Sequence, residues 1–387
     1  MFDKFDHEKP EKYHEGGFCP IELGDRLGDR LGGRFTVLQK LGFGGYGTVW
    51  FVGDDDEKRH SQDVSLKVVA ADSSQDCHST TTVIDRLRHY EHDNQLSSVF
   101  VAELERCFHT SRNGRHLCQG FPVVGPSLAR LSNDHLHLYP SFLKPFACQL
   151  ARVLDSMHSL GVCHGGKQLR RSSLIKMLCH SALANTDKPA DLTLANVALR
   201  LEQSLDDLSE ADLDAIFGPP LKERIDMLFP ALPSPAPSHF VRPVNLGWLP
   251  ATYLSTNVWV LDFDEAFFTQ DPTSELPHVP VEYMAPEAIF ALENGPAADV
   301  WAFGCILVAL RTTWIPFLSL MGGRPLSTAL RMECMLGSLP QQWTSFSFQD
   351  GYPVHGPLEP GIGYSTVEDF QEFGSDSLKA PSDAAGC

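Results

Sequence analysis

A glycine-rich segment between two β-forming stretches constrains the fold of this chain more than any other feature. The segment is Gly42-Phe43-Gly44-Gly45-Tyr46-Gly47, with FTVLQKLG beginning at Phe35 and GTVWFVG beginning at Gly47. β-branched and aromatic residues on both sides of a glycine turn predict two antiparallel strands. A third such stretch, DVSLKVVA from Asp63, extends the predicted antiparallel sheet. A dinucleotide-binding βαβ unit requires a helix directly after its glycines and is therefore excluded.

The glycine turn and a lysine on the third strand together predict a phosphate-binding site. Glycine lets the backbone approach a phosphate closely, although a glycine-rich hairpin is also a common structural turn. Lys67 follows Gly47 by 20 residues, where its ammonium group reaches the phosphates of a nucleotide under the turn. The residues predicted to bind the nucleotide are Leu41, Gly42, Phe43, Gly44, Gly45, Tyr46, Gly47, Val49 and Lys67.

Three further polar residues occupy positions typical of a catalytic base and its metal ligands. Asp191 and Asn196 are related as D-L-x-x-x-N, in which the aspartate accepts a hydroxyl proton and the asparagine holds magnesium. Asp262 ends the predicted strand NVWVLD, where its carboxylate emerges as a second metal ligand. The alternative for Asp191 is a helix-capping role with an incidental asparagine nearby. We predict that Asp191 and Lys67 are catalytic and that Asn196 and Asp262 bind the metal.

Three other residues are predicted to have structural roles near these positions. The blocks EYMAPE, which ends at Glu287, and DVWAFG, which begins at Asp299, are predicted to anchor a substrate-binding segment and the catalytic loop to a buried helix. His164 is interpreted as a structural loop histidine rather than as an acid or base.

Helical spacing appears in the second half of the chain. SFLKPFACQLARVLDSMHSLG predicts an amphipathic helix that ends at Gly161, and ADVWAFGCILVAL, apolar all round, predicts a buried helix. Residues 201–218 predict another helix with a Ser209-x-x-Asp212 start, and 230–243 reads as a proline-rich linker.

Composition narrows the classes of partner and compartment. The formal charge of -18, from 31 basic and 49 acidic residues, disfavours nucleic acid or an anionic membrane as direct partners and favours a basic protein partner. Ten cysteines without a C-x-x-C pair indicate a reducing compartment, so we expect a cytoplasmic and/or nuclear protein. The N-terminus lacks a secretory h-region, and the longest apolar run, Val300 to Leu310, is too short for a membrane span.

The order of these motifs resembles that of eukaryotic serine/threonine protein kinases, and in particular the serine/arginine-rich protein-specific kinase (SRPK) family. The resemblance runs from about Tyr13 to Trp343 and rests also on GGFCPIELGD, NGRHLCQGFPVVGPSL, LDDLSEADLDAIFGPP and MECMLGSLPQQW. It implies an α+β, bilobed protein-kinase fold with a small antiparallel-sheet N-lobe and a larger, mainly helical C-lobe. It also implies ATP and Mg²⁺ as cofactors and the phosphorylation of serines beside arginines in splicing-factor tails.

Domain boundaries follow from this resemblance. We expect an N-terminal tail over 1–34, an N-lobe over 35–124, a C-lobe over 125–347, and a disordered tail over 348–387. Within the C-lobe we expect an insert over 166–190 and a spacer over 201–255, and we expect the protein to be a monomer.

The catalytic loop departs from the family pattern. The histidine-x-aspartate motif is split, because His164-Gly165 is separated from Asp191 by the 25 residues of the insert. Deleting the insert would restore HGDLTLANV as one loop. We interpret it either as a translated retained intron or as an outward-looping insertion, and it places the geometry of Asp191 in question.

Other departures concern the residues around the nucleotide. No glutamate occurs between Asp72 and Tyr90 to pair with Lys67, and the aspartate-phenylalanine-glycine motif reads Asp262-Phe263-Asp264. Thr193 stands where most such kinases have a lysine. Compared with the family pattern, we interpret the C-lobe as truncated after Trp343, without the arginine that the resemblance pairs with Glu287.

Three functions are therefore compared. The first is an active protein kinase, and the second is a weak or inactive pseudokinase that holds arginine-rich partners on an acidic face. The third is a small-molecule phosphotransferase of the aminoglycoside or choline kinase type. Ala285-Pro286-Glu287 and the Asp299 helix disfavour the third, because those enzymes have no equivalent peptide-binding segment.

Overall fold

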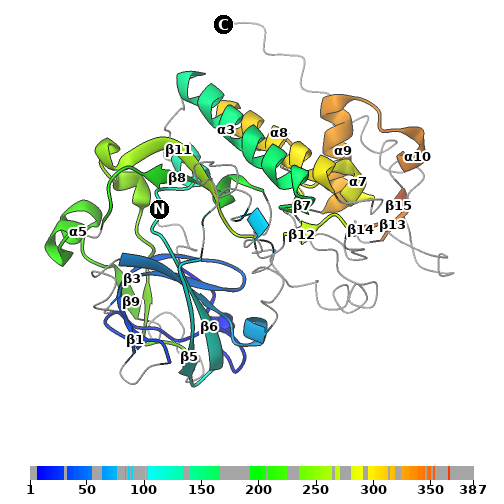
Figure 1. The fold of residues 1–387 in the computed structure, drawn as a ribbon. Coiled ribbons are helices and arrows are strands. Elements are labelled where there is room, and N and C mark those ends of the chain that lie inside the picture. The colour runs from blue at the N-terminus through cyan, green and yellow to red at the C-terminus, as the bar shows by residue number, and fades with distance from the viewer. Residues whose placement is uncertain are drawn as a thin grey trace, which may run out of the picture.

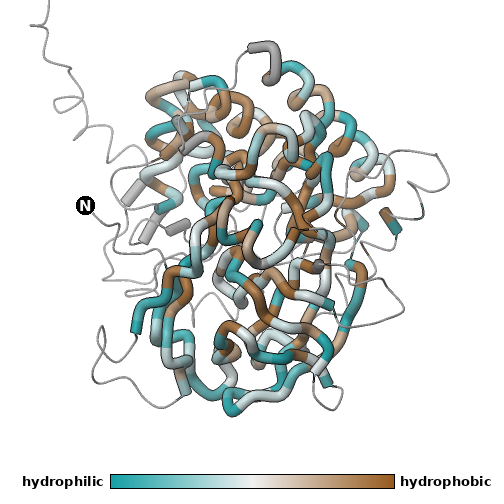
Figure 2. Tube along the Cα trace, turned by 90° about the vertical axis from the view of Figure 1, so that its left-hand side faces the viewer, coloured by the Kyte–Doolittle hydropathy of each residue, from teal (hydrophilic) through white to brown (hydrophobic). Residues whose placement is uncertain are grey.

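The computed structural model shows a six-stranded sheet beside a group of helices (Figure 1). Hydrophobic stretches run through the interior of both parts, and hydrophilic stretches lie on the outer loops of the sheet (Figure 2). The described residues are 7–29, 33–54, 63–75, 83, 86–87, 89, 101, 103–133, 140–165, 192–205, 208–224, 235–263, 266–270, 280–290, 295–312, 314–318, 324–344, 347–349, 352–353 and 365–366.

The sheet is antiparallel throughout, with the order β1-β2-β3-β4-β6-β5. Its strands are β1 (Arg26–Leu27), β2 (Phe35–Phe43), β3 (Gly47–Asp54), β4 (Asp63–Val69), β5 (Glu105–Ser111) and β6 (Gly114–Phe121). The strands predicted from Phe35, Gly47 and Asp63 are confirmed. Their apolar residues form one core in which Phe35, Trp50 and Leu66 are at most 2% exposed.

The N-terminal segment packs against this sheet instead of forming the polar tail expected from its composition. It contains a short 3-10 helix, η1 (Pro10–Lys12), and the strand β1, which pairs with β2. Tyr13 and Phe18 are buried, and the Glu8 carboxylate accepts a hydrogen bond from the Tyr13 hydroxyl and pairs with the buried Lys40 ammonium. The buried aromatic side chains contribute the apolar contact area that holds this segment on the sheet. The polar residues around them in the sequence led to the expectation of a tail.

Helices α3 (Pro140–Ser159) and α8 (Pro296–Thr312) lie side by side in the helical half (Figure 1). The helix predicted to end at Gly161 is confirmed as α3, because Phe146, Leu150 and Met157 are buried on one face at helical spacing. Gly161 follows with a φ of +68°, a conformation that favours glycine at a helix end. The other described helices of this half are α2 (Leu128–Asn133), α7 (Pro286–Ile289), α9 (Pro325–Leu336) and α10 (Gln341–Thr344).

The predicted buried helix forms as α8, but only one of its sides is buried. Ala302, Ile306 and Ala309 are at most 5% exposed, whereas Val300 and Val308 are 54% and 40% exposed. A helix without a polar face does not reveal in its sequence which side the neighbouring helices cover.

The described parts of residues 197–260 form a set of short elements that we call the added layer, and some of their residues, such as Val197 and Val260, belong to the core of the helical half. The elements are β8 (Val197–Leu201), α5 (Glu210–Phe217), β9 (Lys222–Arg224), β10 (His239–Val241), η5 (Leu246–Trp248), η6 (Ala251–Tyr253) and β11 (Leu254–Val260). Ser209 caps α5 with Asp212 as predicted, but the helix begins at Glu210 rather than at 201. The linker interpretation of 230–243 is wrong where β10 pairs with β9 and buries Phe240 and Val241.

Short elements complete the described chain. They are η3 (Asp72–Gln75), η4 (Leu194–Asn196), β7 (Val162–Cys163) paired with β12 (Phe267–Phe268), and β13 (Ser347–Gln349) paired with β14 (Tyr352–Pro353) and β15 (Ser365–Thr366). Residues 166–191, with the insert and Asp191, lie outside the described residues, as does most of 348–387. Among the helices that are described, none combines the length and the hydropathy of a membrane span.

Candidate active site

A pocket of about 850 Å³ lies between the sheet and the helical half. All nine residues predicted to bind the nucleotide line it, from Leu41 through the glycine-rich turn to Val49 and Lys67. The predicted metal ligands Asn196 and Asp262 line the same pocket. Tertiary structure therefore brings together residues that are up to 221 positions apart, from Leu41 to Asp262.

The glycine-rich turn is shaped by close backbone contacts. Gly44 donates its backbone hydrogen bond to the carbonyl of Gly47 at 2.9 Å. A Cβ atom on Gly47 would lie 2.2 Å from the carbonyl oxygen of Val68, so a larger residue cannot occupy this position without moving β4. A Cβ atom on Gly42 or Gly44 would meet no atom within 4 Å, so the backbone there faces open space. This arrangement leaves room for a ligand phosphate beside backbone N–H groups.

Lys67 forms an ion pair with Asp262 inside the pocket. Lys67 stands opposite Val49 in β3 and opposite Gln119 in β6, and its Nζ atom lies 2.9 Å from Oδ1 of Asp262. The two side chains are 19% and 26% exposed, so a ligand entering the pocket can reach both. The ammonium group suits a phosphate, and the carboxylate suits a metal ion that the phosphate also binds.

Asp262 has a strained backbone. Its φ of +60° is the only positive φ of a non-glycine residue among the described residues. Such a conformation costs about 1–3 kcal/mol and is found mainly at functional sites, where the surroundings enforce it. Here the flanking Leu261 donates its backbone N–H to the carbonyl of Asn196 at 2.8 Å, and Phe263 is buried.

Asn196 is held beside Asp262 by the same backbone bond. It ends the short helix η4, whose first turn is capped by the Thr193 hydroxyl, which accepts from the backbone N–H of Ala195 at 3.3 Å. Asn196 is 6% exposed and lines the pocket next to Asp262. An amide oxygen and a carboxylate at one end of a pocket are suitable ligands for Mg²⁺ that remains bound to phosphate and water.

His164 and Asp299 hold the end of strand β7, which precedes the insert. The Oδ2 atom of Asp299 accepts from the backbone N–H of His164 at 3.0 Å, and Oδ1 accepts from that of Gly165 at 3.1 Å. The Nε2 atom of His164 donates to the carbonyl of Leu261 at 3.0 Å, and its ring stacks obliquely on Phe263. Complete burial lowers the pKa of His164, which favours the neutral ring. In this position His164 links the segment before the insert to the Asp262 segment and does not reach the pocket as an acid or base.

Three potential metal ligands lie close together at strand β7. Single ligand atoms of His158, Cys163 and Asp299 lie within 4.8 Å of one another. However, both oxygens of Asp299 already accept hydrogen bonds, one of them from His158 Nε2 at 3.0 Å. Burial raises the pKa of the Cys163 thiol and keeps it protonated, whereas a metal requires the thiolate. His158 and Asp299 are therefore interpreted as a structural hydrogen-bonded pair with the Cys163 thiol beside them.

The other predicted site residues have the following positions. Glu287 lies in the first turn of α7 directly after Pro286, half-buried and without an ion-pair partner among the described residues. Asp191 lies outside the described residues, so its relation to Lys67 remains a prediction.

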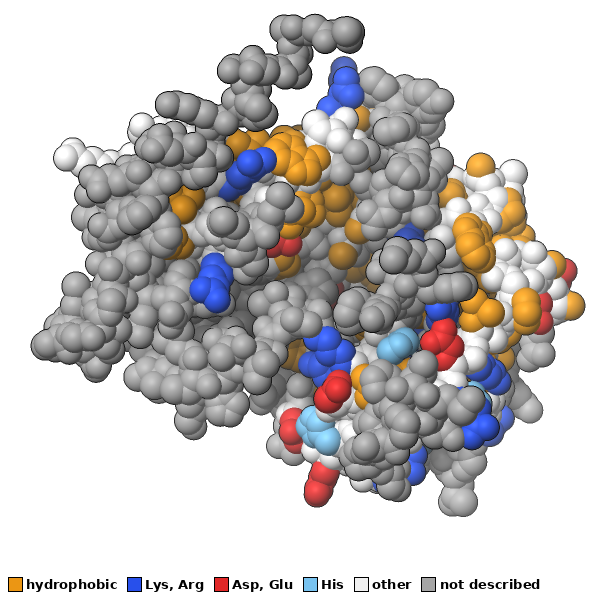
Figure 3. Space-filling view, turned by 180° about the vertical axis from the view of Figure 1, so that it is seen from behind, with side chains coloured by type: hydrophobic (Ala, Val, Ile, Leu, Met, Phe, Trp, Pro, Cys, Tyr) orange, Lys and Arg blue, Asp and Glu red, His pale blue; other side chains and the backbone are white. Residues whose placement is uncertain are grey.

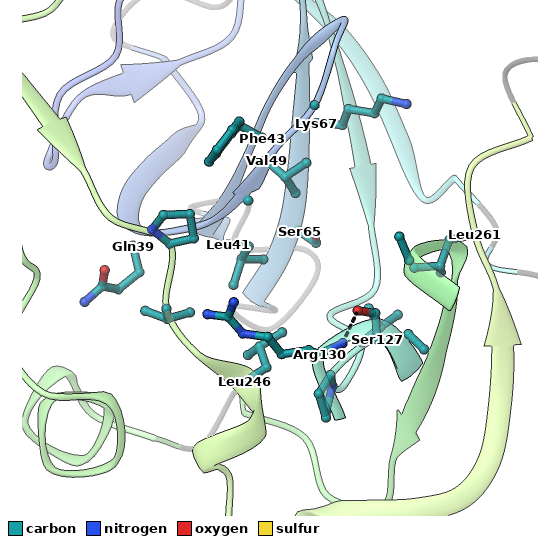
Figure 4. A pocket seen from close by; sticks show the side chains of 18 of the residues that line it. Gln39, Leu41, Phe43, Val49, Ser65, Lys67, Ser127, Arg130, Leu246 and Leu261 are labelled. Atoms are coloured by element: carbon teal, nitrogen blue, oxygen red, sulfur yellow. Dashed lines mark hydrogen bonds between the residues drawn. The ribbon is translucent and has the colours of Figure 1, made fainter. Parts of the chain in front are cut away.

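The structure adds pocket residues that the sequence motifs did not indicate. Arg130 of α2 and Leu246 of η5 lie at the opposite end of the pocket from Lys67 (Figure 4). These residues belong to no local motif, because only the packing of distant segments brings them to the pocket.

Comparisons with known proteins agree with this geometry. No protein-family model matches the chain. Curated relatives include protein kinase dsk1 of Schizosaccharomyces pombe, 29% identical over 194 residues that make up 48% of this chain and 34% of dsk1. The serine/threonine-protein kinase SRPK of Physarum polycephalum is 24% identical over 363 residues, 89% of this chain and 75% of that protein. SRSF protein kinase 3 of Mus musculus is 28% identical over 165 residues, 41% of this chain and 27% of that kinase.

These SRPK-family kinases are homologues of the chain, and the homology implies a protein-kinase fold. The antiparallel sheet and the helices agree with that fold. The matching region spans about a third of dsk1 and about a quarter of SRSF protein kinase 3, at 34% and 27% of their lengths. Kinases in general use ATP and Mg²⁺.

Proposed function

We propose that the chain is an ATP-dependent protein serine/threonine kinase that phosphorylates arginine/serine-rich proteins. The observation that carries this proposal is the 2.9 Å contact between Lys67 and Asp262, in a pocket covered by the glycine-rich turn and bordered by Asn196. A phosphate-binding cation and two oxygen ligands for a metal meet where the backbone leaves space for a triphosphate.

Each residue has a role in the proposed reaction. When ATP and Mg²⁺ bind, Lys67 contacts the phosphates, and Asn196 and Asp262 hold the metal ion. Asp191 orients the hydroxyl group of the substrate serine and accepts its proton. Phosphoryl transfer needs positioning and charge neutralisation more than covalent help, and the fixed backbone of Asp262 contributes to that positioning.

The basic class of substrate is supported by charge and by the relatives. A formal charge of -18 attracts arginine-rich segments over several ångströms at low ionic strength. One homologue is named as an SRSF protein kinase. We propose that the protein acts as a monomer in the cytoplasm and/or the nucleus, where its free thiols stay reduced.

The test has two steps, nucleotide binding and then transfer. Binding of Mg-ATP is measured by calorimetry, and transfer of labelled phosphate is measured on a peptide of alternating arginine and serine. An alanine-for-serine peptide is the matched control for the acceptor, and Lys67→Met is the control for the site. Binding together with transfer supports the kinase, and the absence of binding contradicts the proposal.

The insert favours one alternative, a nucleotide-binding pseudokinase or scaffold that holds basic partners. Residues 166–190 separate Asp191 from His164, which Asp299 holds in place. If the insert displaces Asp191, the loss of a general base reduces the rate by about 10²–10⁴. Mg-ATP binding without transfer, restored to transfer by deletion of 166–190, would identify this alternative.

A further inference from the structure

A seven-residue segment, 242–248, crosses the end of the pocket farthest from Lys67. We call this segment the strap. Six of its residues line the pocket, namely Arg242, Pro243, Val244, Asn245, Leu246 and Trp248. In Figure 4 the Leu246 side chain lies beside Arg130 and below Leu41, at the opposite end from Lys67.

Buried residues anchor the strap at both of its ends. Val241, directly before it, is 1% exposed in the core of the sheet. Leu249, directly after it, is 4% exposed and packs with Phe51 of β3 and with Leu205 and Leu213 in a separate hydrophobic cluster. Hydrophobic side chains reach the surface in places on the face that Figure 3 shows. Within the strap, Trp248 is 62% exposed. The strap therefore cannot swing away without exposing apolar residues at its ends.

Two hydrogen bonds tie the middle of the strap to both sides of the pocket. The backbone N–H of Val244 donates to the carbonyl of Lys40 in β2 at 2.8 Å. The Nε atom of Arg130 in α2 donates to Oδ1 of Asn245 at 3.1 Å. The same oxygen accepts from the backbone N–H of Gly247 at 3.0 Å, which fixes the turn into η5. The strap thus joins the sheet to the helical half across the mouth of the pocket.

The direction of a bound nucleotide follows from the proposed function, on which this inference rests. Its phosphates belong beside Lys67 and Asp262, so its base and ribose extend toward the strap. The base fits between apolar residues such as Val49 and Ala198, which leaves the ribose hydroxyls nearest the mouth. Leu246 and Arg130 would then be the side chains that border this part of the nucleotide.

We propose that the strap closes the ribose side of the pocket and makes this chain selective for nucleotides whose ribose hydroxyls carry no bulky group. A large substituent there has to displace Leu246 and break the bond between Arg130 and Asn245. Leu246 and Arg130 are therefore specificity-determining residues.

The experiment compares two nucleotides on the full chain by equilibrium binding in the presence of Mg²⁺. One is ATP, and the other is ATP that carries an N-methylanthraniloyl ester on a ribose hydroxyl. The ratio of the two Kd values is measured for the wild type, Leu246→Ala and Arg130→Ala. Arg152→Ala, which removes an exposed arginine of α3 outside the pocket, is the matched control.

The wild type and the control variant should bind the ester at least about tenfold more weakly than ATP, because the added group crowds Leu246 and the bond between Arg130 and Asn245. In Leu246→Ala and Arg130→Ala the ratio should fall toward one. Equal binding of both nucleotides by the wild type, or an unchanged ratio in both variants, would overturn the proposal. If the wild type binds neither nucleotide, the proposed kinase function itself fails.

Discussion

Replacement of Asp299 by alanine should destabilise the fold because this buried carboxylate holds the strand end before the insert. Asp299 is 2% exposed, and its two oxygens accept from the backbone N–H groups of His164 and Gly165 at 3.0 and 3.1 Å. His158 donates a third hydrogen bond at 3.0 Å but is partly exposed and can bond to water instead. The main loss therefore concerns the two backbone donors.

A hydrogen bond to a charged group contributes about 1.5–3 kcal/mol, and a buried donor without an acceptor costs a similar amount. Two such bonds correspond to about 3–6 kcal/mol, and water entering the space left by the carboxylate recovers part of this. We expect Asp299→Ala to lower the free energy of unfolding by about 3–5 kcal/mol. Asp299→Asn keeps one carbonyl acceptor and should cost about half as much.

The assay is urea unfolding followed by circular dichroism and tryptophan fluorescence on the same samples. Asp155→Ala is the matched control, because Asp155 is an exposed aspartate on α3 and its loss should change stability by less than about 0.5 kcal/mol. If Asp299→Ala is too unstable to purify, Asp299→Asn still gives a measurable difference. A change below about 1 kcal/mol in both Asp299 variants would refute the reasoning, because that is the size of an ordinary surface substitution.

Three further predictions concern the pocket, the sheet and pH. Lys67→Met should weaken Mg-ATP binding by about tenfold or more in calorimetry, because the charge-assisted bonds to phosphate are lost. Adenosine, which has no phosphate, should bind the variant and the wild type equally. Equal losses of affinity for ATP and adenosine would contradict a phosphate-binding role for Lys67. Arg34→Lys should lower the free energy of unfolding in urea by about 1–3 kcal/mol, because lysine cannot replace the two parallel bonds of 2.6 and 2.5 Å from the guanidinium group to Asp54. An unchanged free energy of unfolding would show that these two bonds are dispensable. Burial lowers the pKa of His164 in the folded state, so the unfolded state binds more protons than the folded state as the pH falls below the ordinary histidine pKa. The free energy of unfolding should therefore decrease below about pH 6.5, by up to about 1.4 kcal/mol per pH unit. A His164→Asn variant should have a shallower slope in the same unfolding series, and an unchanged slope would assign the effect to other groups.

Local patterns in the sequence were sufficient for several elements of the fold. The strands from Phe35, Gly47 and Asp63 and the helix that ends near Gly161 all form where alternation or helical spacing predicted them. The Ser209 cap also follows from residues three positions apart. These features depend on contacts between near neighbours in the chain, which the sequence displays directly. The motif order also identified Lys67, Asn196 and Asp262, which the pocket brings together.

Tertiary structure decided which faces are covered and which distant segments line the pocket. The sequence of the helix from Pro296 to Thr312 is apolar on every side, so only its neighbours determine that Val300 and Val308 remain exposed. The strap shows no motif, because its place depends on Lys40 and Arg130, which lie more than 100 residues away in the sequence. Such contacts form only when distant segments pack together and bury their apolar residues. The sequence by itself determined three strands of the sheet, the Ser209 cap and the positions of Lys67, Asn196 and Asp262 in the motif order, whereas packing placed the strap at the opposite end of the pocket.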